Sequence, residues 1–218
     1  LYGEILTHDP SEPTWLNRDR FVLSAGHGSA LLYATLHVYG YDLPLDEVKR
    51  LRRIGSITPG HPEHGLTPGV ETTTGPLGAG FATAVGMAIA EQKLAAQFND
   101  PDLPIFDHHT YVVSGDGCLM EGISHEAASL AGHLELGKLI VFYDSNQVSI
   151  EGPTSITFTE DVQARFRAYG WQTLEGSAHD MAEILKLTRE AQAQTSKPTL
   201  IELHSVIGQG APTQAGGH

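Results

Sequence analysis

Two polar residues, each shortly after an apolar run, have the types and spacing of a metal site. Asp116 lies between two glycines after the apolar run 110–113, and Asn146 lies thirty residues later, after the run 139–143. A carboxylate and an amide oxygen on short side chains are ligands for a hard cation such as Mg²⁺ or Ca²⁺, and they are unsuited to zinc. Mg²⁺ usually keeps part of its coordination shell for water and phosphate oxygens. The pair therefore predicts a metal site that also binds a phosphorylated ligand.

The elements that position this pair are predicted to be a strand, a helix and a second strand. Residues 123–136, between the two apolar runs, have apolar side chains near helical spacing. Parallel strands joined by a right-handed crossover would place Asp116 and Asn146 side by side at the carboxyl edge of the sheet, where open α/β sheets hold ligands. Gly115 and Gly117 have no side chains, so a bulky anion can approach the backbone there. A helix cap formed by Asp116 is the alternative, and Asn146 at the matching place on the next strand favours the metal site.

The rest of the chain also alternates between short apolar runs and amphipathic segments. The predicted strands outside the central unit are 21–23, 171–174 and 199–207, and the predicted helices are 29–39, 45–51, 81–98, 161–169 and 180–194. This alternation predicts an α/β fold with a doubly wound, mainly parallel sheet and helices on both of its faces. The length of 218 residues favours a single domain over 1–218.

The charge balance is acidic. The chain has 13 basic and 26 acidic residues, a formal net charge of -13, which argues against nucleic acid or an anionic membrane as a partner. A phosphorylated ligand must then be held by a metal ion and by backbone dipoles. The single cysteine, Cys118, fits a reducing compartment, and no apolar run has the length of a membrane span. Because no signal peptide begins the sequence, we expect a cytoplasmic protein.

Histidines in polar loops are weaker candidates for a metal site. His61 and His64 are three residues apart in a loop rich in proline and glycine and could ligate zinc. No cysteine or further histidine completes a tetrahedral site at a recognisable spacing, so we do not favour zinc. His108 and His109 lie in a polar connection and are predicted to form a solvated pair.

Longer segments of the chain resemble transketolases, a family of thiamine diphosphate enzymes. The segments are GDGCLMEGISHE at 115–126, TTTGPLG at 72–78, TPGHPE at 58–63, RDRFVLS at 18–24 and AYGW at 168–171. They occur in the family's order across essentially the whole chain, and Gly-Asp-Gly followed by asparagine resembles the family's diphosphate-binding signature. The resemblance implies the thiamine diphosphate-binding fold and thiamine diphosphate as the cofactor.

The resemblance also implies which residues hold the metal and the diphosphate. Mg²⁺ or Ca²⁺ would be held by Asp116, by Asn146 and by the carbonyl of Val148, and would bridge the two phosphates of the cofactor. Gly117 would offer its amide to the same diphosphate, and Asn146 would contact the cofactor as well. Ser145 departs from the second acidic residue that is common before this asparagine.

Further residues are assigned to the cofactor and the reaction by the same resemblance. His27 falls where the family has a histidine near the diphosphate, and His61 lies in the channel to the substrate and the thiazolium ring. Gly75 and Leu77 belong to a turn beside the aminopyrimidine, and Ile207 corresponds to an apolar contact with the thiazolium. His27 and His61 are therefore expected to be catalytic.

The implied activity is the transfer of a two-carbon glycolaldehyde unit from a ketose or ketose phosphate to an aldose or aldose phosphate. The substrates would be sugar phosphates or hydroxyaldehydes, which implies a role in carbohydrate metabolism and the pentose phosphate pathway. In such enzymes the cofactor supplies the electron sink, while protein groups position it and move protons.

The resemblance covers only one domain of the family, the diphosphate-binding domain. The pyrimidine-binding and C-terminal domains are absent from it. The start at Leu1 without a methionine suggests that the sequence begins partway through a longer chain, and the resemblance implies truncation at both ends. In the family, a glutamate of the pyrimidine-binding domain activates the cofactor across a subunit interface. We therefore expect a homodimer, or a partner chain that carries that domain. Glu121 and Glu126 match family glutamates near a dimer interface, although acidic residues at a helix start are also favoured by the helix dipole.

Three interpretations remain open from the sequence. The chain is the diphosphate-binding part of a transketolase that needs a pyrimidine-domain partner, or a small self-associating enzyme that works without the glutamate, or a non-catalytic cofactor-binding or interaction module. One domain also does not separate transketolase from dihydroxyacetone synthase, which shares this architecture. We favour the first interpretation.

Overall fold

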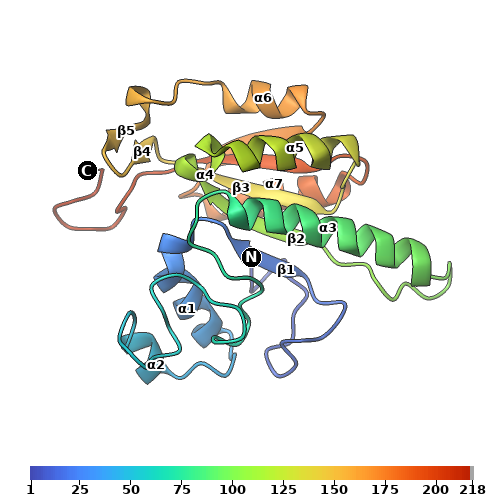
Figure 1. Cartoon of the computed structure of the whole chain (residues 1–218), viewed down its shortest axis with the longest axis horizontal. Helices are drawn as coiled ribbons and strands as arrows, with labels where there is room; N and C mark the ends of the chain where they lie inside the picture. The colour runs from blue at the N-terminus through green and yellow to red at the C-terminus, as the bar shows by residue number, and fades with distance from the viewer. Residues whose placement is uncertain (217–218) are drawn as a thin grey trace.

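A parallel sheet organises the computed structural model, which describes residues 1–216 (Figure 1). The strands of this sheet are β1 (Arg20–Leu23), β2 (Thr110–Gly115), β3 (Leu139–Ser145), β6 (Gln172–Ser177) and β7 (Thr199–His204). A small antiparallel pair, β4 (Val148–Ser149) with β5 (Gly152–Pro153), follows β3. The large sheet has the order β1-β2-β3-β7-β6, and all its neighbouring strands are parallel.

Helices of the described residues cover both faces of the sheet. They are α1 (Ser29–Val38), α2 (Leu45–Lys49), α3 (Ala79–Phe98), α4 (Asp116–Met120), α5 (Gly122–His133), α6 (Val162–Ala168) and α7 (Met181–Ala193), with 3₁₀ turns η1 (Gly26–Gly28) and η2 (Thr154–Ile156). No helix in this part of the chain has the length and apolar character needed to span a bilayer.

Two separate apolar clusters explain why helices pack on both faces. Successive side chains of a strand point to opposite faces, so Val112 and Val141 join one cluster while Tyr111 and Ile140 join the other. The first cluster includes buried side chains of α3, α5 and α6, and the second includes those of α1 and α7. Figure 1 shows α3 and α5 side by side over the first face. The predicted doubly wound α/β fold is confirmed.

The carboxyl edge of the sheet collects the ends of β2, β3 and β7. Gly115 pairs with Asp144 across β2 and β3, and Ser145 pairs with His204 across β3 and β7. The chain builds β1, β2 and β3 in order, then crosses to β6 at the far edge and returns to β7. The direction of the connections thus reverses after β6, which leaves β3 and β7 as neighbours, and open α/β sheets hold ligands at the carboxyl ends of strands beside such a reversal.

Several element boundaries differ from those predicted. The last strand ends at His204 because its neighbour β3 ends at Ser145, so the ladder has no partner for residues 205–207. The helix predicted over 123–136 ends at His133, and Glu135 then takes a left-handed φ of 53° that stops further helix. A separate short helix, α4, was not predicted, and it begins at Asp116 directly after β2.

The prediction of a solvated pair at His108 and His109 is wrong. His108 is 5% exposed, and His109 stacks on Tyr111 with 5.7 Å between ring centroids. The carboxylate of Asp19 accepts the backbone N–H of His109 at 2.7 Å and that of Thr7 at 2.7 Å. Asp19 therefore ties this polar connection to the body of the protein, which the composition of the loop alone does not indicate.

Candidate functional site

Asp116 is a buried carboxylate at the start of α4, with 3% of its surface exposed. Its Oδ1 accepts a hydrogen bond from Tyr143 Oη at 2.6 Å, and its Oδ2 accepts the backbone N–H of Asn146 at 3.2 Å and of Gln147 at 3.1 Å. Burial raises the pKa of the Asp116 carboxyl, and these three donors oppose the rise. A cation beside the carboxylate would favour its ionised form further.

Asn146 and Val148 adjoin this carboxylate on the segment after β3. The Asn146 Nδ2 donates to Asp144 Oδ2 at 3.1 Å, and the Val148 N–H donates to Asn146 Oδ1 at 3.0 Å. An amide oxygen has a second lone pair, so Asn146 Oδ1 keeps the capacity to ligate a cation. Val148 pairs in register with Pro153, which has no N–H to donate to the Val148 carbonyl. The structure thus brings the three predicted metal ligands together.

Glycines bring the neighbouring loops into close packing at this edge. A Cβ on Gly26 would lie 2.8 Å from Thr74 Oγ1 and 3.0 Å from the Gly75 nitrogen. A Cβ on Gly117 would lie 2.9 Å from Leu77 Cδ1. Leu77 therefore occupies part of the space that a side chain at Gly117 would fill. A ligand that approaches the Gly117 backbone would use the remaining space. The loop that carries Gly75 and Leu77 therefore packs against both Gly26 and Gly117 of α4.

The two predicted catalytic histidines lie on exposed loop positions. His61 lies against Gly75, whose φ of +149° favours glycine and whose added Cβ would be 3.4 Å from His61 Cγ. His27 lies in η1, directly after Gly26. No hydrogen bond within residues 1–216 joins His27 to Asp116, so the backbone alone places His27 at this edge.

Ile207 is placed at the same edge through β7. The backbone N–H of Ser205 donates to Ser145 O at 3.2 Å, which continues the β3–β7 contact beyond the ladder. Ile207 follows two residues later, is 38% exposed, and accepts the N–H of Gly216 at its carbonyl at 2.8 Å. An exposed apolar side chain at this position is available to a ligand ring.

The donor set fits a hard cation bound with a phosphorylated ligand. In the described part of the chain, no group of three or more His, Cys, Asp or Glu side chains is arranged to hold a metal by itself. A carboxylate, an amide oxygen and a backbone carbonyl would leave coordination positions for phosphate oxygens. The Thr74 hydroxyl, which lies against Gly26, is buried and has no hydrogen-bond partner among residues 1–216. A polar ligand bound at these loops could form a hydrogen bond with the Thr74 hydroxyl.

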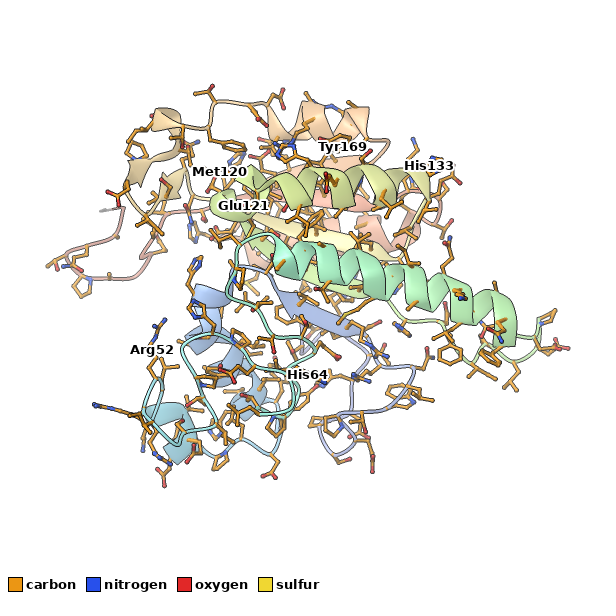
Figure 2. All side chains as sticks on the ribbon, in the orientation of Figure 1. Arg52, His64, Met120, Glu121, His133 and Tyr169 are labelled. Carbon is orange, nitrogen blue, oxygen red and sulfur yellow. The ribbon has the colours of Figure 1, made fainter. Side chains whose placement is uncertain are left out.

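The zinc alternative finds no support in the geometry. The His64 ring nitrogen Nδ1 hydrogen-bonds the Val70 carbonyl at 3.0 Å, whereas His61 lies against Gly75. Figure 2 shows His64 among the lower loops, apart from Glu121 at the turn between α4 and α5. The two histidines therefore serve different local contacts.

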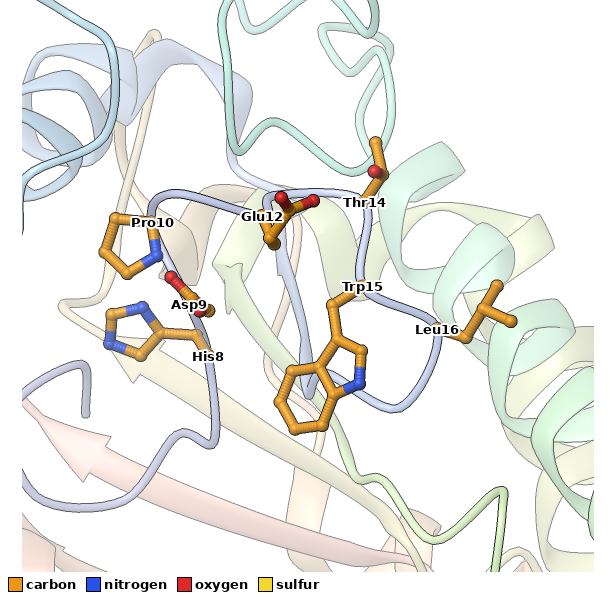
Figure 3. Close-up of a pocket in the computed structure, with 7 residues that line it drawn as sticks. All are labelled: His8, Asp9, Pro10, Glu12, Thr14, Trp15 and Leu16. Carbon is orange, nitrogen blue, oxygen red and sulfur yellow. The ribbon is translucent and has the colours of Figure 1, made fainter.

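Two surface hollows lie away from this edge. One, of about 690 Å³, is lined by residues between His8 and Leu16, and Figure 3 shows the Trp15 ring and the Glu12 carboxylate beside it. The other, of about 560 Å³, lies along α5 and includes His125 and Tyr169. Neither hollow contains a predicted catalytic, cofactor or metal residue, and the second includes Glu126, which the resemblance places near a dimer interface.

Sequence reasoning missed Tyr143 and Asp144, which contact predicted ligands, and Ser205, which contacts Asp144. Tyr143 belongs to the apolar run 139–143 and Ser205 to the strand predicted over 199–207, so the sequence assigns neither of them a polar role. Asp144 precedes Asn146 by two residues and accepts hydrogen bonds from both Asn146 and Ser205. The sequence feature that could have indicated these residues is the presence of polar residues at the ends of β2, β3 and β7, which are neighbours in the sheet.

The fold and the site together define a class. It is that of open α/β proteins whose polar residues gather at the carboxyl ends of adjacent parallel strands, where such folds hold their ligands. Residues 1–218 match the model of a family described as transketolase, thiamine diphosphate binding domain. The chain therefore belongs to the transketolase family and corresponds to its thiamine diphosphate-binding domain, as the sequence resemblance implied.

Relatives in sequence and structure agree with this membership. The chain is 58% identical over 216 residues to transketolase of Treponema pallidum (strain Nichols), covering 99% of this chain and 32% of the relative. It is 59% identical over 217 residues to transketolase 2 of Escherichia coli (strain K12), again covering 99% of this chain and 32% of the relative. The structure matches transketolase from Leishmania mexicana with a TM-score of 0.97 and 52% identity, over 99% of this chain and 32% of the other.

A further structural match is a transketolase of Pichia stipitis in complex with sedoheptulose 7-phosphate. Its TM-score is 0.95 at 52% identity, over 97% of this chain and 31% of the other. The chain thus spans about a third of the length of these relatives.

Proposed function

We propose that this chain supplies the diphosphate- and metal-binding half of a transketolase site. The reaction is the transfer of a two-carbon glycolaldehyde unit from a ketose phosphate to an aldose phosphate. The observation that carries the proposal is the contact of Asp116 with Asn146 at the ends of adjacent strands, within a chain of the transketolase family. The relatives' names support the activity, and the Pichia stipitis structures named as complexes with sedoheptulose 7-phosphate, fructose 6-phosphate and xylulose 5-phosphate support sugar phosphates as substrates.

Each group at the sheet edge has a role in this proposal. Asp116, Asn146 and the Val148 carbonyl hold Mg²⁺ or Ca²⁺, and the Gly117 N–H donates to the diphosphate. Thiamine diphosphate, when bound, supplies the electron sink for breaking a carbon–carbon bond.

Residues on the surrounding loops orient the ligand and move protons. Gly75, Leu77 and Ile207 would line the cofactor and orient it. His27 and His61 are exposed imidazoles on either side of the Gly26–Gly75 packing contact. Imidazole side chains commonly act as proton donors and acceptors in enzyme reactions, which is the role proposed for both histidines.

The proposal includes a partner. The chain corresponds to about a third of its relatives, so we propose that pyrimidine-binding and C-terminal domains act with it, either in a homodimer or on a partner chain. The outer surface of α5 supports an interface, because Ile123 and Leu130 are 47% and 45% exposed there. We place the protein in the cytoplasm, where its one cysteine, the buried Cys118, would stay reduced.

Calorimetric titration of thiamine diphosphate into the purified chain tests this proposal. We expect binding with Mg²⁺ present and its loss on addition of EDTA. Asp116→Asn should abolish the metal-dependent heat, because the uncharged amide removes the only charged ligand of the proposed set. Asp161→Asn, at the N-cap of α6, is the matched control and should bind as the unsubstituted chain does.

Two outcomes separate the alternatives. Metal-dependent binding by the chain alone, followed by glycolaldehyde transfer without a partner, would favour a self-sufficient enzyme. If binding is absent even with a pyrimidine-domain partner chain added, the proposed function is wrong and a non-catalytic module is favoured.

A further inference from the structure

Tyr143 links the hydrophobic core to the proposed metal ligand Asp116. It is the fifth residue of β3, is 3% exposed, and its ring belongs to the apolar cluster under α3 and α5. Its hydroxyl donates to Asp116 Oδ1 at 2.6 Å. A ring fixed by packing on all sides gives its hydroxyl one direction, so Tyr143 determines where that carboxylate oxygen lies.

The second oxygen of Asp116 is held by the chain just after β3. The N–H groups of Asn146 and Gln147 both donate to Oδ2, at 3.2 and 3.1 Å. Gln147 has a left-handed φ of 60°, which is uncommon for a residue with a side chain. This turn points two successive N–H groups at one oxygen atom, so that the carboxylate is fixed by three donors.

Asp144 performs the corresponding function for Asn146. The Asn146 Nδ2 donates to Asp144 Oδ2 at 3.1 Å, and the Ser205 hydroxyl donates to Asp144 Oδ1. Fixing the nitrogen of a side-chain amide also fixes the direction of its oxygen, which is the atom that would ligate a cation. Ser205 follows β7, so this arrangement connects the ends of three adjacent strands.

We propose that Tyr143 and Asp144 are positioning residues for the metal, orienting Asp116 and Asn146 before a cation binds, with Ser205 supporting Asp144. This inference rests on the proposed function, because it requires Asp116 and Asn146 to be the ligands. Partners of metal ligands generally act in this way, since a ligand that is already oriented loses less freedom when the ion binds.

Tyr143→Phe is the sharpest test, because it removes one hydroxyl and keeps the packed ring. Mn²⁺ serves as the probe in place of Mg²⁺, with thiamine diphosphate present, and electron paramagnetic resonance measures free and bound Mn²⁺. We expect Mn²⁺ affinity to fall by roughly 10- to 100-fold and the spectrum of the remaining bound ion to broaden. Ser205→Ala, which leaves Asp144 less fixed, should weaken binding in the same direction by a smaller factor.

Tyr111→Phe is the matched control. Tyr111 is a fully buried tyrosine on the adjacent strand β2, and its hydroxyl accepts a hydrogen bond from Gln192 at 2.8 Å on the opposite face of the sheet. The Tyr111→Phe variant should be less stable than the unsubstituted chain in the absence of metal, but it should bind Mn²⁺ with the same affinity. A purely structural Tyr143 would behave like Tyr111, lowering the unfolding temperature alone.

The outcomes distinguish this inference from the proposed function. If Asp116→Asn loses Mn²⁺ while Tyr143→Phe and Ser205→Ala bind it as tightly as the unsubstituted chain, the inference is wrong and the proposed function stands. If the unsubstituted chain binds no Mn²⁺ with the cofactor, even with a pyrimidine-domain partner chain added, both are overturned. Should Tyr143→Phe fail to fold, Ser205→Ala decides, and unchanged affinity in that variant contradicts the inference.

Discussion

Two buried polar side chains, Asp116 and His108, differ in the hydrogen bonds and charges around them, and these differences determine the charge that each one carries. Asp116 is buried but has three hydrogen-bond donors, and an ionised carboxylate is the form that accepts all three. His108 is buried near positive charges, and its Nδ1 has no hydrogen-bond partner within residues 1–216. Burial, followed by the charge of Arg20, lowers the pKa of His108 to about 4. His108 is therefore neutral in the folded protein over the ordinary pH range.

This neutrality predicts a loss of stability in mild acid. An unfolded chain protonates His108 near its usual pKa of 6.5, whereas the folded chain does so only near 4. Between these values the unfolded state binds more protons, so the free energy of unfolding falls as the pH falls through that window. The full contribution is about 3 kcal/mol. Urea unfolding at pH 7, 6, 5 and 4.5 measures the decline.

His108→Gln provides the comparison for this prediction. The variant has no titrating group at residue 108, so its stability should decline less between pH 7 and pH 4.5 than that of the unsubstituted chain. Taking the difference between the two proteins removes contributions from carboxylates such as Asp19 and Glu91, whose pKa values burial raises. Equal declines in the two proteins would contradict the assignment.

Close approach between elements depends on glycine at particular helix positions. Gly132 lies near the end of α5, and a Cβ there would be 1.8 Å from the Tyr169 carbonyl oxygen. Trp171 Nε1 donates to the Ala128 carbonyl of the same helix at 2.8 Å. Helix α5 therefore lies directly against the turn between α6 and β6, with no room for a methyl group.

We expect Gly132→Ala to destabilise the fold by at least about 2 kcal/mol, because the added methyl group must displace backbone atoms. Gly86→Ala in α3 is the control, since a Cβ at Gly86 would have no atom within 4 Å. That exposed helical position should gain roughly 0.5–1 kcal/mol from the higher helix propensity of alanine. Urea denaturation of both variants measures the two shifts, and a neutral Gly132→Ala would mean that α5 packs less closely than the structure shows.

The molecule has one apolar cluster on each face of its sheet, and it also exposes apolar side chains on its surface. Helices α3, α5 and α6 pack on one face of the sheet and α1 and α7 on the other. Figure 2 shows His133 and Tyr169 along the outer side of the α5 layer, and both belong to the hollow there together with Leu130. An apolar residue beside a hollow suits contact with another chain.

Leu130→Glu should therefore reduce self-association, because a charge would have to be buried at the proposed interface. Val38→Glu, on the exposed side of α1 at 74% exposure, adds the same charge on the other face and serves as the control. Sedimentation velocity should show a smaller species for Leu130→Glu and no change for Val38→Glu. If Leu130→Glu sediments as the unsubstituted chain does, the α5 surface is not the interface.

The sequence by itself determined the central strand–helix–strand unit and the placement of Asp116 and Asn146 at one sheet edge. These features follow from local apolar periodicity and from the geometry of parallel strands, which a single segment of chain contains. The segments that resemble transketolases likewise identified the family, and they predict that Gly75 and Gly117 bind the cofactor.

Only the tertiary structure decided which distant residues surround those ligands. The packing of Leu77 on Gly117, the Tyr143 hydrogen bond to Asp116 and the Ser205 hydrogen bond to Asp144 join segments far apart in the chain. The burial of His108 was also decided there, through Asp19, which binds the adjacent residue's backbone 90 positions away. Such contacts depend on how strands and loops are brought together in space, and residue type and local spacing do not contain that information.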